Sequence, residues 1–446
     1  MPATSRRDFL TSVGTTALGS AAFLGGPMIW GTNPSIVEAE LKPKASDGGD
    51  GKRRLRLAVV TNIWYYHSHA WHMAERFLAG YPIGGKWHRP EIDVVSAYVD
   101  QVGEGDLSRD RAREFGFTIY PTIAETLRCG GDKLAVDAVL LIGEHGEYPV
   151  NDLGQKQYPR YEFFQKIVDV FDQDGRCTPV FNDKHLSWKW AWAKEMVETA
   201  KQRGFPLSAG SSLPHTWRMP SVDLPYEAEA EEILGVAYGP VDIYDFHALE
   251  MMQCLAERRK GGETGIKAIH ALRGDSVWKA FQHESWATGG WDRRLFEACL
   301  SRSQSLAQTP TGSHRYPTFA QMQEWVESPV AYRYEYTDGT RATMLQLNGL
   351  VKDFTCAVRI KGREEPLSTL FYLPPNPNVV YSAALMARAE ELFLTGKAPY
   401  PIERTLLTSG LVEAALRSLA NGEQRLMTPH LDVHYRSPRE SLFWQS

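Results

Sequence analysis

Residues 55–78 read LRLAVVTNIWYYHSHAWHMAERFL, and this stretch decides the fold. The apolar residues 55–60 predict a buried strand, and a helical pattern of apolar positions begins near His69. A strand, a turn and a helix in this order form the phosphate-binding unit of dinucleotide-binding sheets. The turn there reads G-x-G-x-x-G, because only glycine lets the backbone approach a pyrophosphate closely. The turn in this chain, residues 61–69, has aromatic residues and histidines and no glycine. The stretch therefore predicts such a strand and helix with a rewritten turn.

Length and composition indicate a soluble chain with two substantial domains. It has 446 residues, of which 43% are hydrophobic and 23% are charged. The net charge of −5 gives no electrostatic basis for binding nucleic acid or an acidic membrane surface. The five cysteines are widely spaced, without a C-x-x-C or zinc pattern, so we expect core thiols with at most one or two disulfides.

The N-terminus has the features of an export signal. Residues 5–10, SRRDFL, resemble the twin-arginine motif, and a weakly apolar segment follows at residues 13–30. That segment is too short and too rich in glycine for a membrane span. We expect a signal peptide over residues 1–39 and a flexible linker over 40–54. The protein would then be periplasmic or otherwise extracytoplasmic, with no stable membrane span after signal removal. A disordered tail with a chance arginine pair is the alternative.

Strand-like and helix-like segments alternate over residues 55–210. Strands are predicted at 55–60, 92–99, 136–142, 179–182 and 207–209, and helices at 69–79, 108–115, 123–129, 161–171 and 188–203. This alternation predicts a Rossmann-like, doubly wound parallel sheet. Ligands of such sheets bind beyond the carboxyl ends of the strands, so the loops at Thr61, Asp100, Gly143 and Asn182 are the candidate site.

The pattern changes over residues 211–380. Strands are predicted at 233–238, 266–272, 330–336, 342–348, 354–361 and 368–372, with short connections between the later ones. This pattern favours a C-terminal α+β domain with a mostly antiparallel open sheet and helices on one face. Residues 381–446 then contain the closing helices and the tail.

Several short segments carry informative motifs in a fixed order. They are AREFG at 112–116, YPTIAETL at 120–127, VDAVLLI at 136–142, FNDKHLS at 181–187 and TPHLDV at 428–433. Together they resemble the Gfo/Idh/MocA oxidoreductase family over residues 55–435. The resemblance implies an oxidoreductase with a tightly held nicotinamide dinucleotide, NAD or NADP. It would pass hydride to or from a sugar, cyclitol or related polyol.

The resemblance also implies catalytic residues. Lys184 stands where the family has the lysine that hydrogen-bonds the reacting hydroxyl. Its neighbours Asp183 and His185 can adjust its pKa, and His185 can itself accept the proton. His247 is the acid–base candidate of the second domain, where the family's D-x-x-x-H pair is not present in clean form. The alternative for Lys184 is a surface lysine without a catalytic role, and the alternative for His247 is a core or capping histidine.

The cofactor contacts implied by the resemblance are Asn62, Trp64, Asp100, Glu144 and His145. Asp100 ends a strand where an acid binds the ribose hydroxyls, although it also fits a simple strand-end cap. Glu144 and His145 lie in the loop that faces the nicotinamide in this family. Trp64 cannot cradle phosphate as glycine does, but it can stack on a sugar or fill the emptied pocket.

His67, His69 and His72 support a second hypothesis, in which the fold has lost the dinucleotide. Positions 69 and 72 share one helix face, so two imidazoles can meet one divalent metal ion. The chain would then be a metal-dependent carbohydrate lyase or hydrolase, or a carbohydrate-binding protein. No zinc-binding spacing is present, and His72 also fits a helix residue packed under the sheet.

The resemblance further implies a homo-oligomer joined through the second-domain sheet. Tyr332, Tyr334 and Tyr336 alternate along one predicted strand, and alternate residues of a strand share a face. That tyrosine face is the candidate interface.

Overall fold

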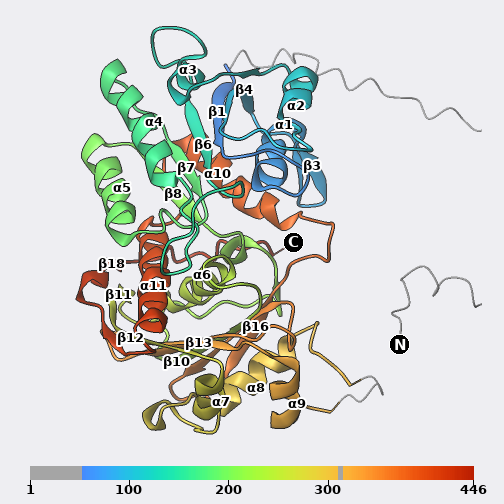
Figure 1. Cartoon of the computed structure of the whole chain (residues 1–446), viewed down its shortest axis with the longest axis vertical. Helices are drawn as coiled ribbons and strands as arrows, with labels where there is room; N and C mark the ends of the chain where they lie inside the picture. Colours follow the sequence, from blue (N-terminus) through green and yellow to red (C-terminus); the bar gives the residue numbers. More distant parts are fainter. Residues whose placement is uncertain (1–52, 310–314, 446) are drawn as a thin grey trace, which may run out of the picture. The chain divides into compact units, whose positions relative to one another are not determined.

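The computed structural model describes residues 53–309 and 315–445 (Figure 1). These residues belong to one compact unit, residues 46–446. The predicted signal peptide, residues 1–39, and nearly all of the predicted linker lie outside the described residues. Within the described part of the chain, no helix combines the length and apolar character needed to cross a membrane.

The N-terminal half forms a six-stranded sheet in the order β5-β4-β1-β6-β7-β8, and every pairing is parallel. Its strands are β1 (Leu55–Thr61), β4 (Ile92–Val99), β5 (Thr118–Ile119), β6 (Ala138–Ile142), β7 (Val180–Asp183) and β8 (Leu207–Gly210). Its connecting helices are the π-helical turn η1 (Ala70–Ala74), α1 (Glu75–Ala79), α2 (Ser108–Phe115), α3 (Ile123–Arg128), α4 (Arg160–Asp174) and α5 (Trp190–Arg203). The doubly wound parallel sheet predicted from the sequence is confirmed, and β4 and α2 have the predicted bounds.

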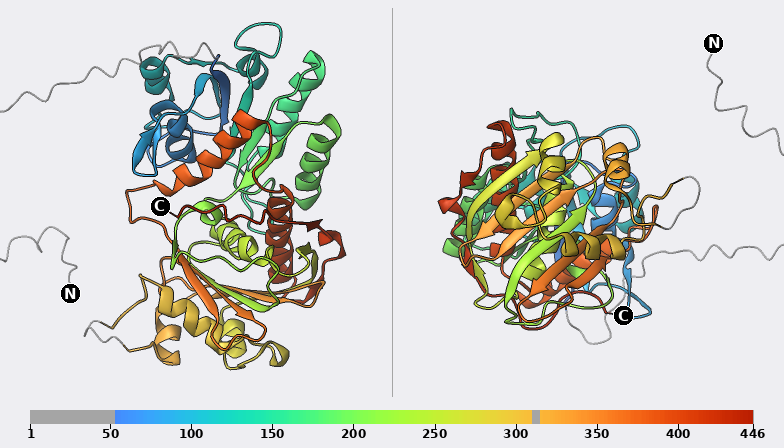
Figure 2. Two further views of the ribbon diagram at one scale, coloured as in Figure 1. Left: turned by 180° about the vertical axis from the view of Figure 1, so that it is seen from behind. Right: turned by 90° about the horizontal axis from the view of Figure 1, so that it is seen from below.

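Both faces of this sheet are covered, as parallel strands require. Val60 and Leu141 pack with apolar residues of α3, α4 and α5, whereas Leu57 and Leu140 pack on the other side with η1 and α1. That second side is completed by α10 (Tyr381–Thr395), a helix from late in the chain (Figures 1 and 2). One predicted closing helix is therefore part of the N-terminal layer.

The second half forms an eight-stranded sheet in the order β17-β12-β13-β14-β10-β15-β16-β9. Its strands are β9 (Arg218–Met219), β10 (Ala230–Ala237), β12 (Ile266–Arg273), β13 (Val330–Tyr336), β14 (Arg341–Gln346), β15 (Phe354–Ile360), β16 (Leu367–Phe371) and β17 (Leu426–Met427). Only the β10–β14 pairing is parallel. The predicted mostly antiparallel sheet is confirmed. Shorter elements are the pairs β2 (Tyr81–Ile83) with β3 (Lys86–His88) and β11 (Glu263–Thr264) with β18 (His434–Tyr435), and the 3-10 turns η2 (Leu213–His215), η3 (Trp286–Thr288) and η4 (Pro429–Leu431).

Helices cover both faces of the second sheet, where the sequence predicted helices on one face only. The helices α6 (Tyr244–Ala256) and α11 (Glu403–Ala420) lie on one side, and α7 (Asp275–Phe281), α8 (Arg293–Arg302) and α9 (Phe319–Trp325) lie on the other (Figures 1 and 2). Neighbouring residues of β10 divide accordingly, because Ile233 packs toward α6 while Leu234 packs toward α8. The helices α7 to α9 were missed because their short apolar runs interrupt the strand pattern without long periodicity.

The tyrosine face does not form an exposed interface. Tyr332, Tyr334 and Tyr336 are all buried against α6. The Tyr332 hydroxyl donates to Asp245 at 2.9 Å, and the Tyr336 hydroxyl donates to Gln253 at 2.8 Å. Period-two alternation correctly grouped the three side chains, but it cannot tell an internal helix from a second subunit as the covering element.

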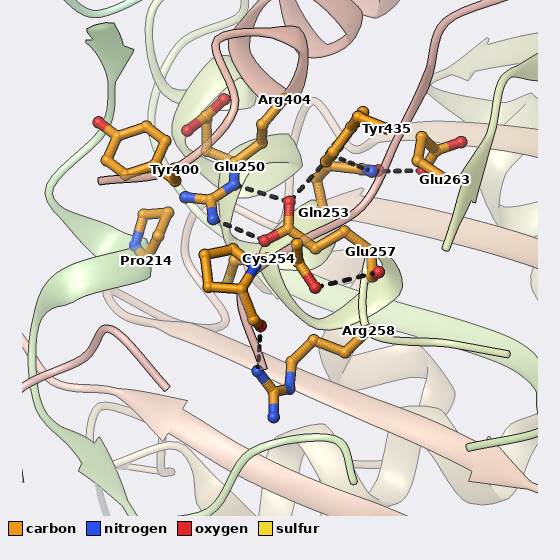
Figure 3. A network of polar contacts seen from close by, with 12 residues as sticks. Pro214, Glu250, Gln253, Cys254, Glu257, Arg258, Glu263, Tyr400, Arg404 and Tyr435 are labelled. Atoms are coloured by element: carbon orange, nitrogen blue, oxygen red, sulfur yellow. Dashed lines mark hydrogen bonds and ion pairs between the residues drawn. The ribbon is translucent and has the colours of Figure 1, made fainter. Parts of the chain in front are cut away.

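A buried polar network fixes α6 against α11 and the C-terminal segment (Figure 3). The Arg404 guanidinium of α11 donates to both carboxylate oxygens of Glu257, which follows α6, at 2.8 and 2.6 Å. The Tyr435 hydroxyl of β18 donates to the same carboxylate at 2.9 Å, and Gln253 donates to the Tyr435 hydroxyl at 2.9 Å. The position of α6, whose first turn carries His247, therefore depends on this network. All five cysteines are free thiols, and Cys254, Cys299 and Cys356 lie in the core.

Candidate active site

Loops that follow β1, β6 and β7 meet at the carboxyl edge of the parallel sheet. The Asn62 side-chain amide donates to the backbone oxygen of His145 at 3.1 Å, and the Asn62 backbone N–H donates to Ile142 at 3.2 Å. The backbone N–H of Lys184 donates to Gly210, which ends β8, at 3.1 Å. The sequence predicted these loops as neighbours, and the structure brings them together. We call His69, Glu144, His145, Arg160, Asp183, Lys184 and His247 the carboxyl-edge cluster.

The charged centre of the cluster is Glu144, which lies between two cations. Its carboxylate accepts from the Lys184 ammonium at 3.1 Å and from the Arg160 guanidinium, and all three side chains are buried. Burial alone would raise the pKa of Glu144, but the charges of Lys184 and Arg160 outweigh it and hold that pKa well below its ordinary value. Lys184 also has a left-handed backbone, with φ of 62°, which is uncommon for a lysine. Arg160 begins α4, and the sequence analysis did not identify it.

His185 packs against Arg160 and Phe246. Its imidazole lies 3.2 Å from Nη1 of Arg160 and against the ring of Phe246. Burial, followed by the charge of Arg160, lowers the pKa of His185 well below its ordinary value, so the ring is neutral. The predicted proton acceptor is therefore a buried, neutral ring in contact with Arg160.

A buried Asp–His pair lies beside the lysine. Nδ1 of His69 lies 2.6 Å from a carboxylate oxygen of Asp183, and the His69 side chain is 12% exposed while Asp183 is fully buried. Burial raises the pKa of Asp183 to about 7, against the lowering effect of Lys184. Burial and then the Lys184 charge lower the pKa of His69 well below its ordinary value. The pair therefore titrates as a coupled unit, and its neutral imidazole can accept a proton at Nε2.

His247 approaches the cluster from the second domain. The Ser211 hydroxyl lies 2.6 Å from Nδ1 of His247, so a loop after β8 orients the ring. Burial and then the Lys184 charge lower the pKa of His247 well below its ordinary value. Nearby, Asp242 has a left-handed φ of 71°, and burial raises its pKa to about 8. Its carboxylate accepts from the backbone N–H of Lys156 at 2.8 Å.

The turn after β1 does not fit a dinucleotide pyrophosphate. The Trp64 side chain is completely buried, stacks on Phe117 with centroids 5.9 Å apart, and donates to Glu75 at 3.2 Å. The Ser68 hydroxyl oxygen accepts the N–H of Trp71 at 3.3 Å, which lies in the first turn of η1. A phosphate would need an open backbone and free N–H groups at this place. Trp64 is thus a core residue and has no free face for stacking on a ligand.

Asp100 is also engaged within the chain. One carboxylate oxygen accepts from the Tyr98 hydroxyl at 2.6 Å, and the other accepts from the Tyr148 hydroxyl at 2.7 Å. Each carboxylate oxygen thus has a partner within the chain, while the Asp100 side chain stays exposed. The predicted cofactor contacts are thus divided, because Glu144 and His145 belong to the cluster and Asn62 contacts it through His145, whereas Trp64 and Asp100 have partners elsewhere in the chain.

The three histidines of the turn do not form a metal centre. The ring of His67 stacks on Trp71 with centroids 5.2 Å apart, and its backbone is left-handed. The rings of His69 and His72 lie edge to face at 4.5 Å, and His69 is paired with Asp183. Among the residues that the structure describes, no group of three His, Cys, Asp or Glu side chains has the arrangement to hold a metal ion. The metal alternative is therefore not supported.

No protein-family model matches the sequence, and no curated protein is significantly similar to it. Solved structures do match. GenD2 from gentamicin A biosynthesis, in complex with NAD, is 14% identical over 84% of this chain and 97% of its own, with a TM-score of 0.53. A protein described as a probable dehydrogenase from Thermotoga maritima is 12% identical over 84% of this chain and all of its own, with a TM-score of 0.51. A Gfo/Idh/MocA family oxidoreductase from Vibrio cholerae is 13% identical over 82% of this chain and 99% of its own, with a TM-score of 0.46. The described chain thus has the two-sheet α/β fold of GenD2, on which its own side chains build the carboxyl-edge cluster.

Proposed function

We propose that this chain is an enzyme that removes a proton from a hydroxylated, carbohydrate-like small molecule at the carboxyl-edge cluster. The observation that carries the proposal is the buried Asp183–His69 pair beside the Lys184 ammonium. Proton abstraction needs a general base, which the carboxylate holds in position here, and a cation beside it that stabilises the developing negative charge.

Each residue has a definable task in that reaction. Asp183 holds the Nδ1–H of His69, so Nε2 is the atom that takes the proton. Lys184 has three N–H donors, and within the described residues only one bond, to Glu144, engages them. A remaining N–H can donate to the substrate oxygen on which negative charge develops. Glu144 accepts from both Lys184 and Arg160 and so fixes the ammonium in place.

The chemistry that fits is elimination from a sugar whose reacting carbon lies next to a carbonyl or carboxyl group. His69 takes the proton from that carbon, the electron pair forms a double bond, and an oxygen leaving group departs at the neighbouring carbon. The His69 imidazolium formed in this step carries the proton that the leaving oxygen takes up, and the neutral ring of His247 can exchange a hydrogen bond with a substrate hydroxyl. The exposed ring of Tyr66 and the partly exposed ring of Tyr65 offer apolar faces for a sugar.

A second candidate is the NAD(P)-dependent oxidoreductase implied by the family resemblance, acting on a sugar, cyclitol or related polyol. The fold shared with GenD2, which was solved with NAD, favours it. The filled turn at Trp64 and the occupied carboxylate of Asp100 oppose it, and no hydride step is derived for this chain.

Mass spectrometry of the small molecules released from denatured protein separates these candidates. Stoichiometric NAD or NADP supports the oxidoreductase, whereas its absence together with turnover of an acidic or keto sugar to an unsaturated product supports elimination. His69→Asn should abolish that turnover. The matched control is His434→Asn, because His434 forms an Asp–His pair of the same 2.6 Å length with Asp432 on the surface. Equal loss in both variants would refute the assignment.

We also propose export through the twin-arginine route, on the basis of Arg6 and Arg7. Fusion of residues 1–45 to a reporter that is active only outside the cytoplasm tests it. Replacement of both arginines by lysine should keep the reporter inside, and unchanged export would count against the proposal.

A further inference from the structure

A second polar site lies on the face of the second sheet that points away from α6. Along β13, Tyr332 and Tyr334 point to α6, so Arg333 and Glu335 point to the opposite side. His270 of β12 is paired directly with Arg333 across the two strands. This face is therefore separate from the carboxyl-edge cluster, and the site is independent of the proposed function.

Arg333 is buried there without a carboxylate partner. Its Nε donates to the backbone oxygen of Gly290 at 3.1 Å, and Nη2 donates to the backbone oxygen of Trp286 at 2.9 Å. Nη1 has no hydrogen-bond partner among the described residues and is not sealed off from solvent. Arg333 is only 8% exposed, and burial lowers its pKa to about 10. A buried cation with free donors is costly unless an anion pairs with it.

A cavity of about 210 Å³ opens beside that free nitrogen, lined by Ala268, His270, Trp286, Ala287, Gly289, Arg333, Glu335 and Arg425. A water molecule takes up roughly 30 Å³ in the liquid, so the space suits a small organic molecule. The Arg333 guanidinium lies 4.2 Å from the centroid of the Trp286 ring, and the two planar groups form one corner of the cavity.

The lining carries positive charge. Arg425 donates to Glu335 at 3.2 Å, and Glu335 also accepts from Lys267 at 3.0 Å. This carboxylate is thus shared by two cations, whereas Arg333 forms no ion pair with a described residue. His270 is held neutral, because burial and then the charge of Arg333 lower its pKa, so its ring can exchange hydrogen bonds with a hydroxyl.

We propose that this cavity binds the carboxylate of an acidic sugar, a uronate, with Arg333 and Arg425 holding the carboxylate and Trp286 lying against the ring. A guanidinium pairs with a carboxylate through charge-assisted hydrogen bonds, and sulfate, which offers the same charge, lacks the sugar ring that would lie against Trp286. The indole supplies an apolar surface for the C–H face of a pyranose. Glu335 and His270 supply acceptors for its hydroxyls.

Titration calorimetry of the whole chain with D-glucuronate tests the proposal, with D-glucose and inorganic sulfate as comparison ligands. Glucuronate should bind, glucose should not, and sulfate should bind at least tenfold more weakly. Removing a charge-assisted hydrogen bond should weaken binding by about 10- to 100-fold, as expected for Arg333→Met. Because Arg333 also holds two backbone carbonyls, the half-exposed Arg425→Gln serves as a second variant, with about a three- to tenfold loss.

Lys361→Gln is the matched control, because it removes an exposed cation that follows β15 and lies outside the cavity. Its affinity for glucuronate should equal that of the unmodified chain. Three results would overturn the proposal: no glucuronate binding, equal binding of glucose or sulfate, or unchanged affinity in both arginine variants. Burial of the cavity in a dimer of the purified chain would overturn it as well.

Discussion

Replacement of Glu144 by glutamine tests the electrostatic logic of the carboxyl-edge cluster. The carboxylate is 3% exposed and bonded to Arg160 and Lys184, whose side chains are 0% and 5% exposed. Glutamine keeps the shape but leaves two buried cations without an anion. Breaking a buried ion pair in this way costs about 3–5 kcal/mol of folding free energy. We expect Glu144→Gln to fall in that range, with the second stranded cation placing it at the upper end.

The loss should be partly recovered by removing one of the stranded cations. Lys184→Met alone leaves Glu144 paired with Arg160, so we expect a smaller cost of about 1–3 kcal/mol. In the double variant the ammonium is absent, so its loss of folding free energy should be smaller than the sum of the two single losses by about 1–3 kcal/mol. Urea unfolding followed by tryptophan fluorescence gives all four free energies of the cycle.

The pH dependence of the contribution of Glu144 to folding stability has a definite sign. A carboxylate whose folded pKa lies below its unfolded value, about 4.3 for glutamate, stabilises the fold above that value and loses this contribution only in stronger acid. The Glu144 carboxylate itself should therefore contribute no pH dependence between pH 6 and pH 8, and any change in the cost of Glu144→Gln over that range reports Asp183, whose pKa of about 7 the Glu144 charge helps to raise. A cost below about 1 kcal/mol, or strict additivity with Lys184→Met, would refute the account.

Three further outcomes follow from other groups. With a substrate identified, kcat/KM should rise with pH around pH 7, because protonation of the coupled His69–Asp183 pair removes the base. Asp183→Asn should lower kcat about 10²- to 10⁴-fold and abolish this pH dependence. A pH profile that the variant leaves unchanged would contradict the assignment. Asp242→Asn should raise the melting temperature more at pH 8 than at pH 5. The raised pKa of Asp242, about 8, means that this aspartate destabilises the fold increasingly as pH rises, and asparagine tolerates the left-handed φ of the position. An equal shift of the melting temperature at both pH values would argue against burial as the cause of the raised pKa. Arg404→Met should lower the unfolding free energy by about 3–5 kcal/mol because it strands the buried Glu257 carboxylate, and a change within about 0.5 kcal/mol in urea titrations would show that the network does not secure α6.

The parallel sheet could be predicted because its signal is local. Strands β1 and β4 are apolar runs of fixed length, and each is followed by a helix with its own periodicity. The loop positions of Asn62, Glu144 and Lys184 followed directly, since the carboxyl ends of parallel strands share one edge.

Side-chain pairing at that edge could not be predicted in the same way. His69 and Asp183 are separated by 114 positions, and which oxygen or nitrogen meets which depends on rotamers and on the η1 turn. Arg160 has no local mark that distinguishes it from a surface arginine at a helix start, yet it is fully buried. The sequence also could not predict whether Trp64 is buried, because an indole is suited both to stacking on a ligand and to packing in a core.

The helix α10 has a consequence for how the protein is made. Its residues Leu385, Leu392 and Phe393 pack on the same side of the first sheet as Leu57 and Leu140 of β1 and β6. During synthesis the ribosome releases those strands more than two hundred positions before the helix, and until then this side of the sheet is covered only by η1 and α1. We therefore expect residues 55–210 to need α10 for stable folding. A fragment cut at that boundary should be recovered only as aggregates, whereas co-expression with a segment carrying α10 should restore soluble material.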